Sequence, residues 1–486
     1  MSRRTRRQFL EDSMFAAAAA VAAGSGARAL AADEKPEFKS PGETLGVAVV
    51  GCGGRGSDHL QTWARRGDTE VRYVVDVDEN IGGRKAKAIG DMQGRAPKVI
   101  TDMREAFDDK SLDVVTTATP NHWHALVSIW AMQAGKDVYV EKPVSHNVSE
   151  GRRIVDVARK YKKICQTGTQ SRSMKGMRDA MQYVHDGKIG KLNVARGLCY
   201  KRRKSIGPLG NYPIPDGVNY DLWLGPAQYA PLTRQRFHYD WHMQTPYGNG
   251  DLGNQGIHQM DLCRWALGVD KLSNSVFSYG GRLGYEDAGD AANTQMIVHD
   301  YGDRALVFEV RGLETGPYRD AKVGIILEGS EGFVVMTSYS SGAAFDLDGK
   351  KVHEFSGGGD HYANFIDAVR SRKPEDLNAE IEEGHLSSAL CHLGNISYHL
   401  GEQVSVDEVK ERLKGVSSPE HLVDTYARFT EHLSDNKLDL ETTKLSYGPT
   451  LPINTDNETF VDNEKEATML TRDSRAPFVV PPKSQI

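Results

Sequence analysis

Cysteine is scarce in this chain, and its arrangement argues against two classes of protein. The 486 residues contain five cysteines, an odd number without the paired spacing of a zinc or iron–sulfur site. They are Cys52, Cys165, Cys199, Cys263 and Cys391. The contexts of Cys52, Cys165 and Cys263 are apolar or glycine-rich and indicate burial. We therefore expect neither a disulfide framework nor a metal held by cysteine.

Long apolar runs and basic surfaces are also lacking. Beyond the N-terminus, no stretch approaches the about 20 apolar residues that a membrane-spanning helix needs. The basic run Lys201-Arg202-Arg203-Lys204 is short, and the net charge of the chain is −6. We interpret this run as a solvated strand end or loop rather than a polyanion site, and we expect no nucleic-acid partner.

The first residues carry a targeting pattern. The segment Thr5-Arg6-Arg7-Gln8-Phe9-Leu10 precedes an apolar run over residues 14–23, which is too short to span a bilayer, and small residues follow at positions 27–32. The pattern predicts a twin-arginine signal peptide over residues 1–31, passage through the twin-arginine translocase and a periplasmic location. An uncleaved leader that tethers the protein to the membrane and a merely disordered basic N-terminus are the alternatives.

A dinucleotide-binding fingerprint follows the leader. Residues 45–50 have the valine-rich pattern of a buried strand, and Gly51-Cys52-Gly53-Gly54-Arg55-Gly56 comes directly after it, ahead of a helical segment. Glycines let the backbone approach a pyrophosphate, which the free N–H groups of the helix N-terminus then bind. A second strand, 71–75, ends at Asp76, whose carboxylate suits the ribose hydroxyls of NAD and repels the 2′-phosphate of NADP. We predict NAD as the cofactor, with NADP as the alternative, bound by Gly51, Gly53, Gly54, Arg55, Gly56 and Asp76.

Strands and helices continue to alternate up to about residue 170. Strands are expected at 113–117, 137–140 and 164–167, and helices at 121–134 and 149–161. Such alternation favours a doubly wound parallel sheet, whose ligands bind at the carboxyl ends of the strands. Two polar motifs fall at these ends. They are Thr119-Pro120-Asn121-His122-Trp123-His124 and Glu141-Lys142-Pro143.

With these motifs the chain resembles the Gfo/Idh/MocA oxidoreductase family. Two further matching segments, Gly256-Ile257-His258-Gln259-Met260-Asp261 and Asn364-Phe365-Ile366-Asp367-Ala368-Val369, extend the resemblance over about residues 45–400. The resemblance implies an N-terminal Rossmann domain, placed here at 45–170, and a C-terminal α/β domain with a large open sheet, placed at 171–435. It also implies an NAD(P)-dependent enzyme that acts on a carbohydrate or related polyol, and a homodimer or homotetramer formed through that sheet.

The resemblance makes Lys142 the leading catalytic candidate, and its chemistry fits independently. An ammonium beside the nicotinamide can polarise a carbonyl or assist proton transfer from a hydroxyl, and Pro143 favours an extended backbone at Lys142. Glu141 is expected to orient the nicotinamide or its ribose. The pair His122 and His124 lacks a third ligand, so we expect no metal. Further cofactor contacts are expected from Thr119, Asn121, His124, Lys142 itself and Gln170, and a substrate contact from Arg172.

A predicted helix over residues 251–267 carries the second catalytic candidate. Asn254, His258 and Asp261 are spaced so that they share one helical face. His258 can take the hydroxyl proton while hydride leaves the carbon. The family often has an aspartate where this chain has Asn254, and an amide cannot act as a base, which puts the family's usual proton relay in doubt. We expect both Asn254 and His258 to contact substrate.

Aromatic side chains gather in the segment between the two halves of the chain. They are Tyr220, Trp223, Tyr229, Phe237, His238, Tyr239, Trp241, His242 and Tyr247. The cluster predicts either a wall on which sugar rings stack or an irregular loop pinned by its own aromatic residues. In the first case, Tyr239 and His242 are the expected substrate contacts.

The C-terminal half has the pattern of an antiparallel sheet followed by helices. Strands are expected at 192–200, 275–281, 294–299, 305–310, 323–327 and 333–337, and helices at 361–371 and 379–400. The fold class is therefore α/β, with a Rossmann sheet and a second domain built on a large, mostly antiparallel sheet. The last segment, 436–486, is polar and extended, and we expect it to wrap a domain or a neighbouring subunit.

The leader and the fingerprint together constrain the function. Free NAD is not expected in the periplasm, so a cofactor bound before export would have to stay bound and be recycled. We therefore expect a sugar-directed oxidoreductase with tightly bound cofactor, in which Lys142 and His258 take part in hydride and proton transfer. The first alternative is an NAD-dependent glycosidase or lyase that oxidises a sugar hydroxyl transiently, and the second is a non-catalytic cofactor-binding protein.

Overall fold

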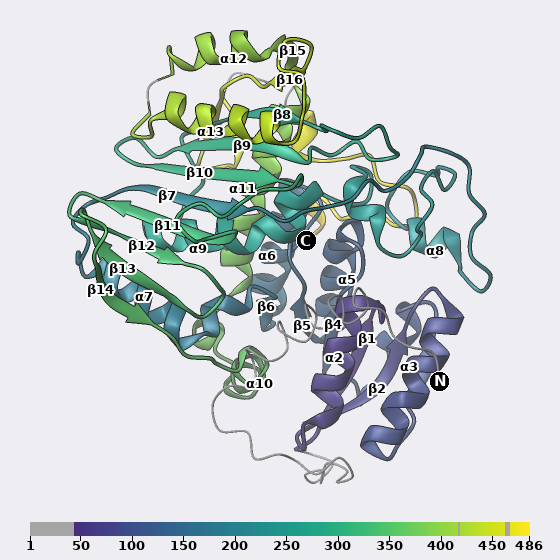
Figure 1. Cartoon of the computed structure of the whole chain (residues 1–486). Coiled ribbons are helices and arrows are strands. Elements are labelled where there is room, and N and C mark those ends of the chain that lie inside the picture. The colour runs from purple at the N-terminus through teal and green to yellow at the C-terminus, as the bar shows by residue number, and fades with distance from the viewer. Residues whose placement is uncertain (1–42, 417, 462–466) are drawn as a thin grey trace, which may run out of the picture.

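The protein consists of a smaller N-terminal unit and a larger unit built on a broad sheet (Figure 1). The structure is a computed structural model that describes residues 43–416, 418–461 and 467–486. The predicted signal peptide, residues 1–31, lies outside the described residues.

The N-terminal unit contains a six-stranded parallel sheet in the order β3-β2-β1-β4-β5-β6. Its strands are β1 (Leu45–Val50), β2 (Thr69–Val75), β3 (Lys98–Ile100), β4 (Val114–Thr117), β5 (Asp137–Val140) and β6 (Cys165–Thr167). The predicted Rossmann sheet is confirmed. β3 escaped prediction because its three residues are too few to give an apolar pattern. The strand order reverses between β1 and β4, which is the point where sheets of this kind bind ligands.

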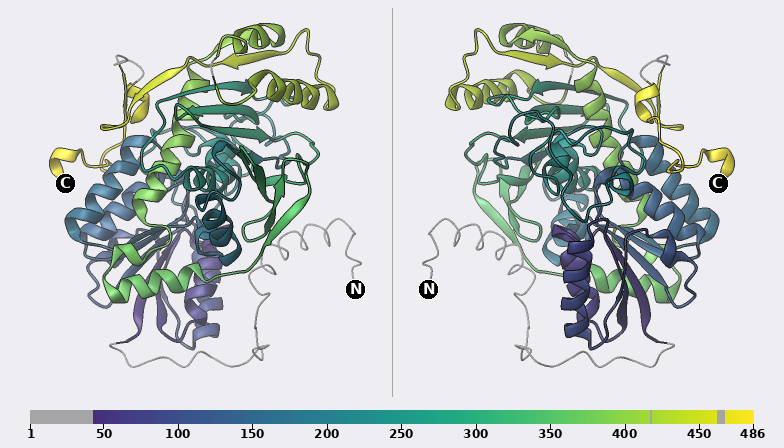
Figure 2. Two further views of the ribbon diagram at one scale, coloured as in Figure 1. Left: turned by 90° about the vertical axis from the view of Figure 1, so that its left-hand side faces the viewer. Right: turned by 90° about the vertical axis from the view of Figure 1, so that its right-hand side faces the viewer.

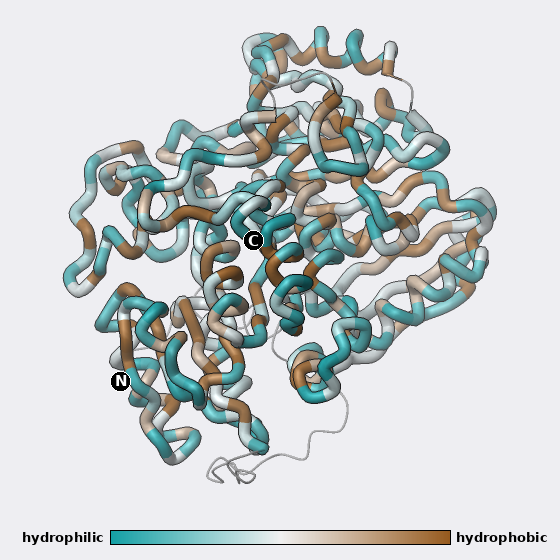
Figure 3. Tube along the Cα trace, turned by 180° about the vertical axis from the view of Figure 1, so that it is seen from behind, coloured by the Kyte–Doolittle hydropathy of each residue, from teal (hydrophilic) through white to brown (hydrophobic). Residues whose placement is uncertain are grey.

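Helices cover both faces of this sheet. The helices on one face are α5 (Asn121–Gln133) and α6 (Val148–Tyr161), with the short α4 (Arg104–Phe107); those on the other are α2 (Gly54–Arg65), α3 (Glu79–Gln93) and α10 (His361–Ser371). Strand β1 serves both faces, since Val47 and Val49 join one core cluster while Ala48 and Val50 join the other. Double burial explains the continuous apolar pattern of the parallel strands. Figure 3 shows the resulting apolar stretches in the interior of the trace.

The larger unit contains a twelve-stranded sheet whose main path runs β14-β13-β12-β11-β7-β10-β9-β8-β16-β15. Its strands are β7 (Leu192–Cys199), β8 (Ser275–Gly281), β9 (Thr294–Asp300), β10 (Ala305–Arg311), β11 (Val323–Gly329), β12 (Gly332–Met336), β13 (Gly342–Asp346), β14 (Lys351–Phe355), β15 (Glu402–Ser405), β16 (Lys444–Tyr447), β17 (Leu451–Asn454) and β18 (Thr459–Phe460). The predicted large, mostly antiparallel sheet is confirmed, and it includes a parallel pair, β10 with β7. A long crossover that includes a helix separates these two strands, which is the connection that parallel pairing needs.

Two groups of helices cover the faces of the large sheet. The inner face packs against α7 (Lys175–His185), α9 (Ile257–Leu267) and α11 (Ile381–His399), and the outer face against α12 (Val406–Leu413) and α13 (Leu422–Asp435). Figure 1 shows α12 and α13 lying over β8, β9 and β10. The inner helices therefore separate the large sheet from the Rossmann unit.

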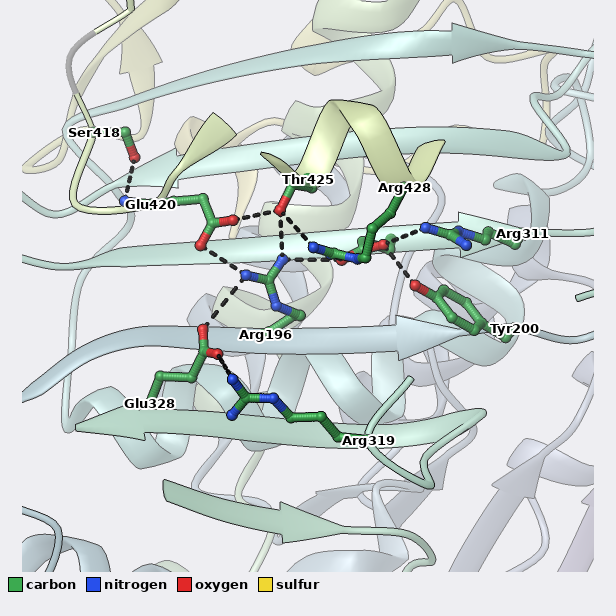
Figure 4. Close-up of polar contacts among 10 residues, drawn as sticks. Arg196, Tyr200, Arg311, Arg319, Glu328, Ser418, Glu420, Thr425 and Arg428 are labelled. Carbon is green, nitrogen blue, oxygen red and sulfur yellow. Dashed lines mark hydrogen bonds and ion pairs between the residues drawn. The ribbon is translucent and has the colours of Figure 1, made fainter. Parts of the chain in front are cut away.

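A buried charge network joins α13 to the outer face of the sheet (Figure 4). Glu309 of β10 accepts hydrogen bonds from Arg196 at 2.9 Å, Arg428 at 2.6 Å and Arg311 at 3.1 Å, and Arg196 also donates to Glu420 at 2.7 Å. Burial alone would raise the pKa of Glu309, but the three arginines outweigh it and lower that pKa to about 2. Because these charges are withdrawn from water, each depends on its partners.

Two irregular segments, a strap and the C-terminal tail, pack against the Rossmann unit. Residues 216–228, named the strap here, contain α8 (Tyr220–Leu224). The C-terminal tail returns from β18 along the Rossmann helices (Figure 2), where Phe478 packs against Trp123 and Trp130 with ring centroids 5.4 and 6.4 Å apart. The remaining short helices are η1 (Gln170–Ser173), η2 (Asp240–Met243), η3 (Leu252–Gly256), η4 (Pro374–Asp376), η5 (Thr468–Leu470) and η6 (Lys483–Gln485).

All five cysteines are free and buried in this structure. Among the helices that the structure describes, none combines the length and apolarity needed to cross a membrane.

Candidate functional site

The glycine loop between β1 and α2 has the shape of a pyrophosphate cradle. Gly51 has φ +79°, and a Cβ there would lie 2.8 Å from the backbone nitrogen of Thr119. A Cβ on Gly56 would lie 1.7 Å from the carbonyl oxygen of Gly51, so the loop and helix can pack only with glycine. At Gly53 and Gly54, by contrast, an added Cβ meets nothing within 4 Å. The loop is therefore closed toward the sheet and open in front of the helix N-terminus, as a bound dinucleotide requires.

A groove, named the dinucleotide groove here, runs from this loop along the strand ends. Its lining includes Gly51, Gly53, Gly54, Arg55, Asp76, Thr119, Trp223, His238, Tyr239, Trp241 and Asn254. Asp76 lies at the end of β2, where its Oδ2 accepts a hydrogen bond from the Cys52 N–H at 2.8 Å and its Oδ1 one from the Asp78 N–H at 3.0 Å. Burial raises the pKa of Asp76. The two backbone bonds hold the carboxylate at the groove wall, where the prediction places a ribose.

Glu141 ties the groove to the helix behind it. Its Oε1 accepts hydrogen bonds from Arg55 Nε at 2.8 Å and from His59 Nε2 at 3.1 Å. Burial alone would raise the pKa of Glu141, but Arg55, His59 and Lys142 together hold it well below its ordinary value. The carboxylate is therefore ionised and largely committed to these partners, so it positions Arg55 and the strand end.

Lys142 reaches from the end of β5 to the other unit. Its Nζ donates a hydrogen bond to the backbone oxygen of Asn254 at 2.8 Å. Burial lowers the pKa of Lys142 from 10.5 to about 8; Glu141 opposes this shift, while Arg55 and other cations add to it. Near neutral pH the ammonium therefore gives up its proton far more readily than a solvated lysine does.

His258 lies one turn beyond Asn254, but the helix between them is irregular. Residues Leu252–Gly256 form a π-helical turn, and the α-helix proper begins only at Ile257. The predicted common face of Asn254, His258 and Asp261 assumed regular α-helical spacing, which this turn changes. Asp261 instead joins an ion pair away from the groove.

The His258 side chain is buried, and one of its ring nitrogens is unpaired within the described part of the chain. Its Nδ1 has no hydrogen-bond partner among the described residues, and its ring lies 5.0 Å from that of Tyr339. Burial, followed by the charge of Lys142, lowers the pKa of His258 well below its ordinary value. The imidazole is therefore neutral near pH 7 and can accept a proton.

Asn121 and His124 serve as joints between segments. Asn121 Nδ2 donates to Asn249 Oδ1 at 2.9 Å, which links α5 to the loop before η3. The two ring nitrogens of His124 lie 2.5 Å from the Pro143 oxygen and 2.8 Å from the Thr119 oxygen. His124 thus links the two polar motifs. It also positions Thr119, which lines the groove.

The structure does not bring Arg172 or Gln170 to the dinucleotide groove. Arg172 donates to both oxygens of Asp261, at 2.8 and 2.9 Å, and to Glu383 at 3.0 Å, while its guanidinium lies over the ring of Trp265. The guanidinium of Arg172, which the sequence analysis predicted to contact substrate, is therefore engaged in a buried ion pair. Gln170 opens the turn η1 and is not among the groove residues.

The aromatic cluster divides into two parts. Trp223, Phe237 and Tyr247 form a small core of their own, in which the buried Arg234 stacks on all three rings. In contrast, His238, Tyr239, Trp241 and one side of Trp223 line the groove. His242 lies behind this wall, where its Nδ1 is 2.7 Å from the Tyr239 oxygen. The loop is therefore pinned by some of its aromatic residues and offers others to a ligand.

The strap is held against the Rossmann unit at the end of the groove that carries Asp76. The Asn219 N–H donates to the Val77 oxygen at 2.8 Å, and the Glu79 N–H donates to the Gly217 oxygen at 3.0 Å. Just beyond the strap, His238 Nε2 lies 3.0 Å from Asp78 Oδ2. These contacts span the strand end that carries Asp76, so the groove is covered from outside.

The C-terminal tail holds the strap from the opposite side. Arg475 donates to Asp221 Oδ1 at 2.6 Å and to the Gly225 oxygen at 3.2 Å, and Gln228 donates to the Asp473 oxygen at 3.0 Å. The strap is thus clamped between the tail and the Rossmann unit.

Sequence reasoning missed four polar side chains near Lys142 and His258, namely Lys201, Arg203, Gln255 and Tyr339. Lys201 Nζ donates to Gln255 Oε1 at 3.0 Å, and Gln255 Nε2 donates to the Tyr339 hydroxyl at 2.8 Å. Arg203 contacts both oxygens of Asp251 at 2.7 to 3.0 Å. The period of two along an extended segment could have separated Lys201 and Arg203 from their outward-facing neighbours.

Chemically, this arrangement is a proton-transfer site beside a dinucleotide cradle. Across the described parts of the chain, no group of three or more histidine, cysteine, aspartate or glutamate side chains is placed to hold a metal. Lys142 and His258 are the groups that can exchange protons, and the groove supplies the place for a redox cofactor.

Two family models match the chain. One, for the NAD-binding Rossmann fold of an oxidoreductase family, matches residues 45–169, and the other, for the C-terminal alpha/beta domain of the same family, matches residues 196–433. The first model confirms the predicted NAD-binding Rossmann domain.

Curated relatives match in part. The levoglucosan dehydrogenase of Pseudarthrobacter phenanthrenivorans is 24% identical over 245 residues, which cover 49% of this chain and 54% of that protein. The inositol 2-dehydrogenase of Salmonella typhimurium is 31% identical over 159 residues (32% and 46%), and the alpha-N-acetylgalactosaminidase of Shewanella oneidensis is 28% identical over 174 residues (33% and 38%). The matched part thus spans about half, or less, of each relative.

The fold is shared with solved structures. GenD2 from gentamicin A biosynthesis, crystallised with NAD, superimposes with a TM-score of 0.54 and 20% identity over 74% of this chain and 96% of that one. This likeness shows the fold, and the two matching models, which cover most of both units, show the family. The chain belongs to the Gfo/Idh/MocA oxidoreductase family.

Proposed function

We propose that the protein is a sugar-directed oxidoreductase that retains its NAD and recycles it within one active site. The observation that carries this proposal is the contact of Lys142 with Asn254, which joins a lysine of low pKa to the groove and to the neighbouring His258. A lysine that loses its proton near pH 8 and a neutral imidazole are suited to moving the proton of a sugar hydroxyl.

NAD fits the residues present, since Gly53 and Gly54 leave an open cradle and Asp76 stands at the ribose position. When bound, NAD accepts hydride from a carbon that carries a hydroxyl, or returns hydride to a carbonyl. Lys142 holds a proton at Nζ next to the reacting oxygen of the sugar, and the ammonium polarises that oxygen. His258 Nδ1, buried and without a partner among the described residues, receives or supplies the proton.

Retention of the cofactor is supported by the strap. Dissociation of a dinucleotide from the groove would require the strap to leave Val77 and Glu79, and the tail residue Arg475 opposes that movement through Asp221 and Gly225. A cofactor held in this way has to be returned to its starting state by a second half-reaction on the same protein.

The predicted export would fit the same scheme. The twin-arginine pattern in residues 1–31 would carry the folded protein to the periplasm with NAD already bound. We include this location, the translocase and a homo-oligomer in the proposal.

A second candidate function is glycoside cleavage by transient oxidation. It is favoured by the match to a relative named alpha-N-acetylgalactosaminidase. In this scheme oxidation of a sugar hydroxyl to a ketone acidifies the neighbouring C–H, and loss of that proton expels the aglycone, which leaves as its alcohol. Water adds to the resulting double bond in a glycosidase, but not in a lyase, and hydride is then returned to the ketone of the same sugar. The same Lys142 and His258 would serve both functions.

One experiment tests the proposal and separates the two functions. The purified protein is analysed for bound nucleotide by mass spectrometry, and a panel of free sugars and glycosides is then added without external NAD. The proposal predicts bound NAD and turnover of a donor sugar that depends on an added acceptor sugar. Turnover of a single glycoside without an acceptor would instead favour glycoside cleavage. If purified protein holds no nucleotide and needs free NAD for every turnover, retention is refuted.

A further inference from the structure

In the basic run at residues 201–204, alternate side chains point to opposite faces, so that one pair points inward and the other outward. Along β7 and the segment after it, Cys199 belongs to the inner core cluster while Leu198 and Tyr200 belong to the outer one. Because successive side chains alternate, Lys201 and Arg203 continue the inner face. Arg202 is exposed and pairs with the exposed Glu314 at 3.1 Å. The run therefore presents two cations to the site and is not wholly solvated.

The inward lysine is anchored next to Lys142. Lys142 donates to the backbone oxygen of Asn254, and Lys201 donates to the side-chain oxygen of the next residue, Gln255. Both acceptors belong to the π-helical turn, so Lys142 and Lys201, which come from different units, are anchored to consecutive residues. Lys201 is close enough to lower the pKa of both Lys142 and His258, although burial is the larger cause in each case.

The carboxylates near this pair are already engaged. Asp251 is paired through both oxygens with Arg203, whose remaining Nη1 donates to the Tyr239 hydroxyl at 2.9 Å. Glu141 is shared between Arg55 and His59. Arg55 also pairs with the exposed Asp58 at 3.3 Å. Among the described residues, the four cations Lys201, Lys142, Arg203 and Arg55 thus face three carboxylates, which leaves one positive charge in excess. Burial lowers the pKa of Lys201, and the charge of Arg203 adds to this shift while Asp251 opposes it.

The surplus charge lies outside the cradle for the cofactor. Arg55 lines the dinucleotide groove, whereas Lys201 does not. A pyrophosphate at the glycine loop would therefore not meet the Lys201 ammonium, whose described hydrogen bond is to a neutral amide oxygen. The excess is placed on the side of Lys142 and His258, where the substrate reacts.

We propose that the substrate is an anionic sugar, with a carboxylate or phosphate group that pairs with Lys201 while a hydroxyl of the same sugar reaches Lys142 and His258. This inference rests on the proposed function and specifies its substrate class. Lys201 is a specificity residue in this scheme, and Arg203, neutralised by Asp251, positions the wall of the site through Tyr239.

The test compares matched pairs of sugars on the NAD-loaded protein. Glucose, galactose and mannose, as methyl glycosides, are each paired with the uronate and with the 6-phosphate, and both reduction of the bound cofactor and the thermal midpoint of the holoenzyme are measured. One charge-assisted hydrogen bond predicts a preference of about 10- to 100-fold for at least one anionic member over its neutral partner. The uronate and phosphate arms distinguish the two anions.

Three variants assign the preference to the lysine. Lys201→Met is expected to remove the preference by weakening the anionic sugar alone, and Lys201→Arg to retain most of it. Arg202→Met, from the same run but facing outward, is the matched control and should leave it unchanged.

Equal response to neutral and anionic sugars in the wild type would overturn the inference, and this comparison needs no variant to fold. An equal loss for both sugars in Lys201→Met would also overturn it. If neutral sugars turn over and anionic ones do not, the proposed function stands and this inference fails. If no sugar of either kind changes the cofactor, the proposed function fails, and the thermal midpoints decide whether anionic sugars still bind through Lys201.

Discussion

Replacement of Lys142 by methionine is expected to change stability and activity in opposite directions. The pKa of Lys142 falls from 10.5 to about 8, mainly through burial, which corresponds to about 3 kcal/mol against the charged form. Partial solvent access reduces this penalty to about 2 to 3 kcal/mol. The variant also loses the hydrogen bond to the Asn254 oxygen, worth about 1 kcal/mol. Lys142→Met should therefore stabilise the apoprotein by about 1 to 2 kcal/mol at pH 7 while lowering sugar turnover about 10²- to 10⁴-fold.

The stability advantage of Lys142→Met over the wild type depends on pH. Between pH 8 and 10.5 the unfolded chain binds more protons at position 142 than the folded one, so the wild type gains stability as pH rises. The advantage of the variant is therefore full below pH 8 and lost above 10.5. Denaturant titration of both apoproteins at pH 7 and 10.5 measures it, with Lys204→Met at an exposed position as the control. A variant that is less stable at pH 7, or a difference that does not vary with pH, would refute the reasoning.

Three further predictions concern other parts of the molecule. Glu309→Gln should cost about 3 to 5 kcal/mol at pH 7 because it leaves the buried Arg196 and Arg311 and the half-buried Arg428 underpaired, whereas Glu314→Gln at an exposed pair should cost little. Since the pKa of Glu309 is about 2, its contribution is present above about pH 4.5 and lost as pH falls toward 2, so denaturation curves of wild type and variant should converge there; a gap that persists would contradict this. Phe478→Ala and Arg475→Ala should speed the loss of bound NAD during dialysis at least about 10-fold through the weakened strap, unlike Val479→Ala at an exposed position, and equal retention in all three would exclude the clamp. Asn254→Asp adds a negative charge beside Lys142 and should raise its pKa above about 8, so that the pH of half-maximal turnover moves upward relative to Asn254→Gln; an unmoved profile would count against Lys142 as the titrating group.

Local sequence patterns predicted the fold well because burial and backbone geometry act on neighbouring residues in the chain. Strand β1 and the glycines after it are recognisable since burial on two faces demands valine and close backbone approach demands glycine. The same reasoning predicted that Lys142 lies at a strand end. The π-helical turn at Leu252–Gly256 could not be predicted, because nothing in the local apolar spacing distinguishes it from α-helix.

Long-range pairing decided the remaining site residues. Arg172 was predicted to meet substrate, yet it pairs with Asp261, 89 residues further along the chain. Lys201 was assigned to a solvated run, although it meets Gln255, 54 residues away, inside the site. A single sequence carries no signal for such pairs, because each residue type is equally at home on a surface and in a buried ion pair.

The central claim is that hydride moves between sugars on one retained cofactor, and isotope transfer tests it most directly. A donor sugar deuterated at the carbon that is oxidised is supplied to the purified protein with an acceptor sugar and an excess of free unlabelled NAD. The account predicts deuterium in the reduced acceptor and none in the free nucleotide. Deuterium that accumulates in the free NADH pool would contradict retention and make the protein a dehydrogenase of the exchanging kind.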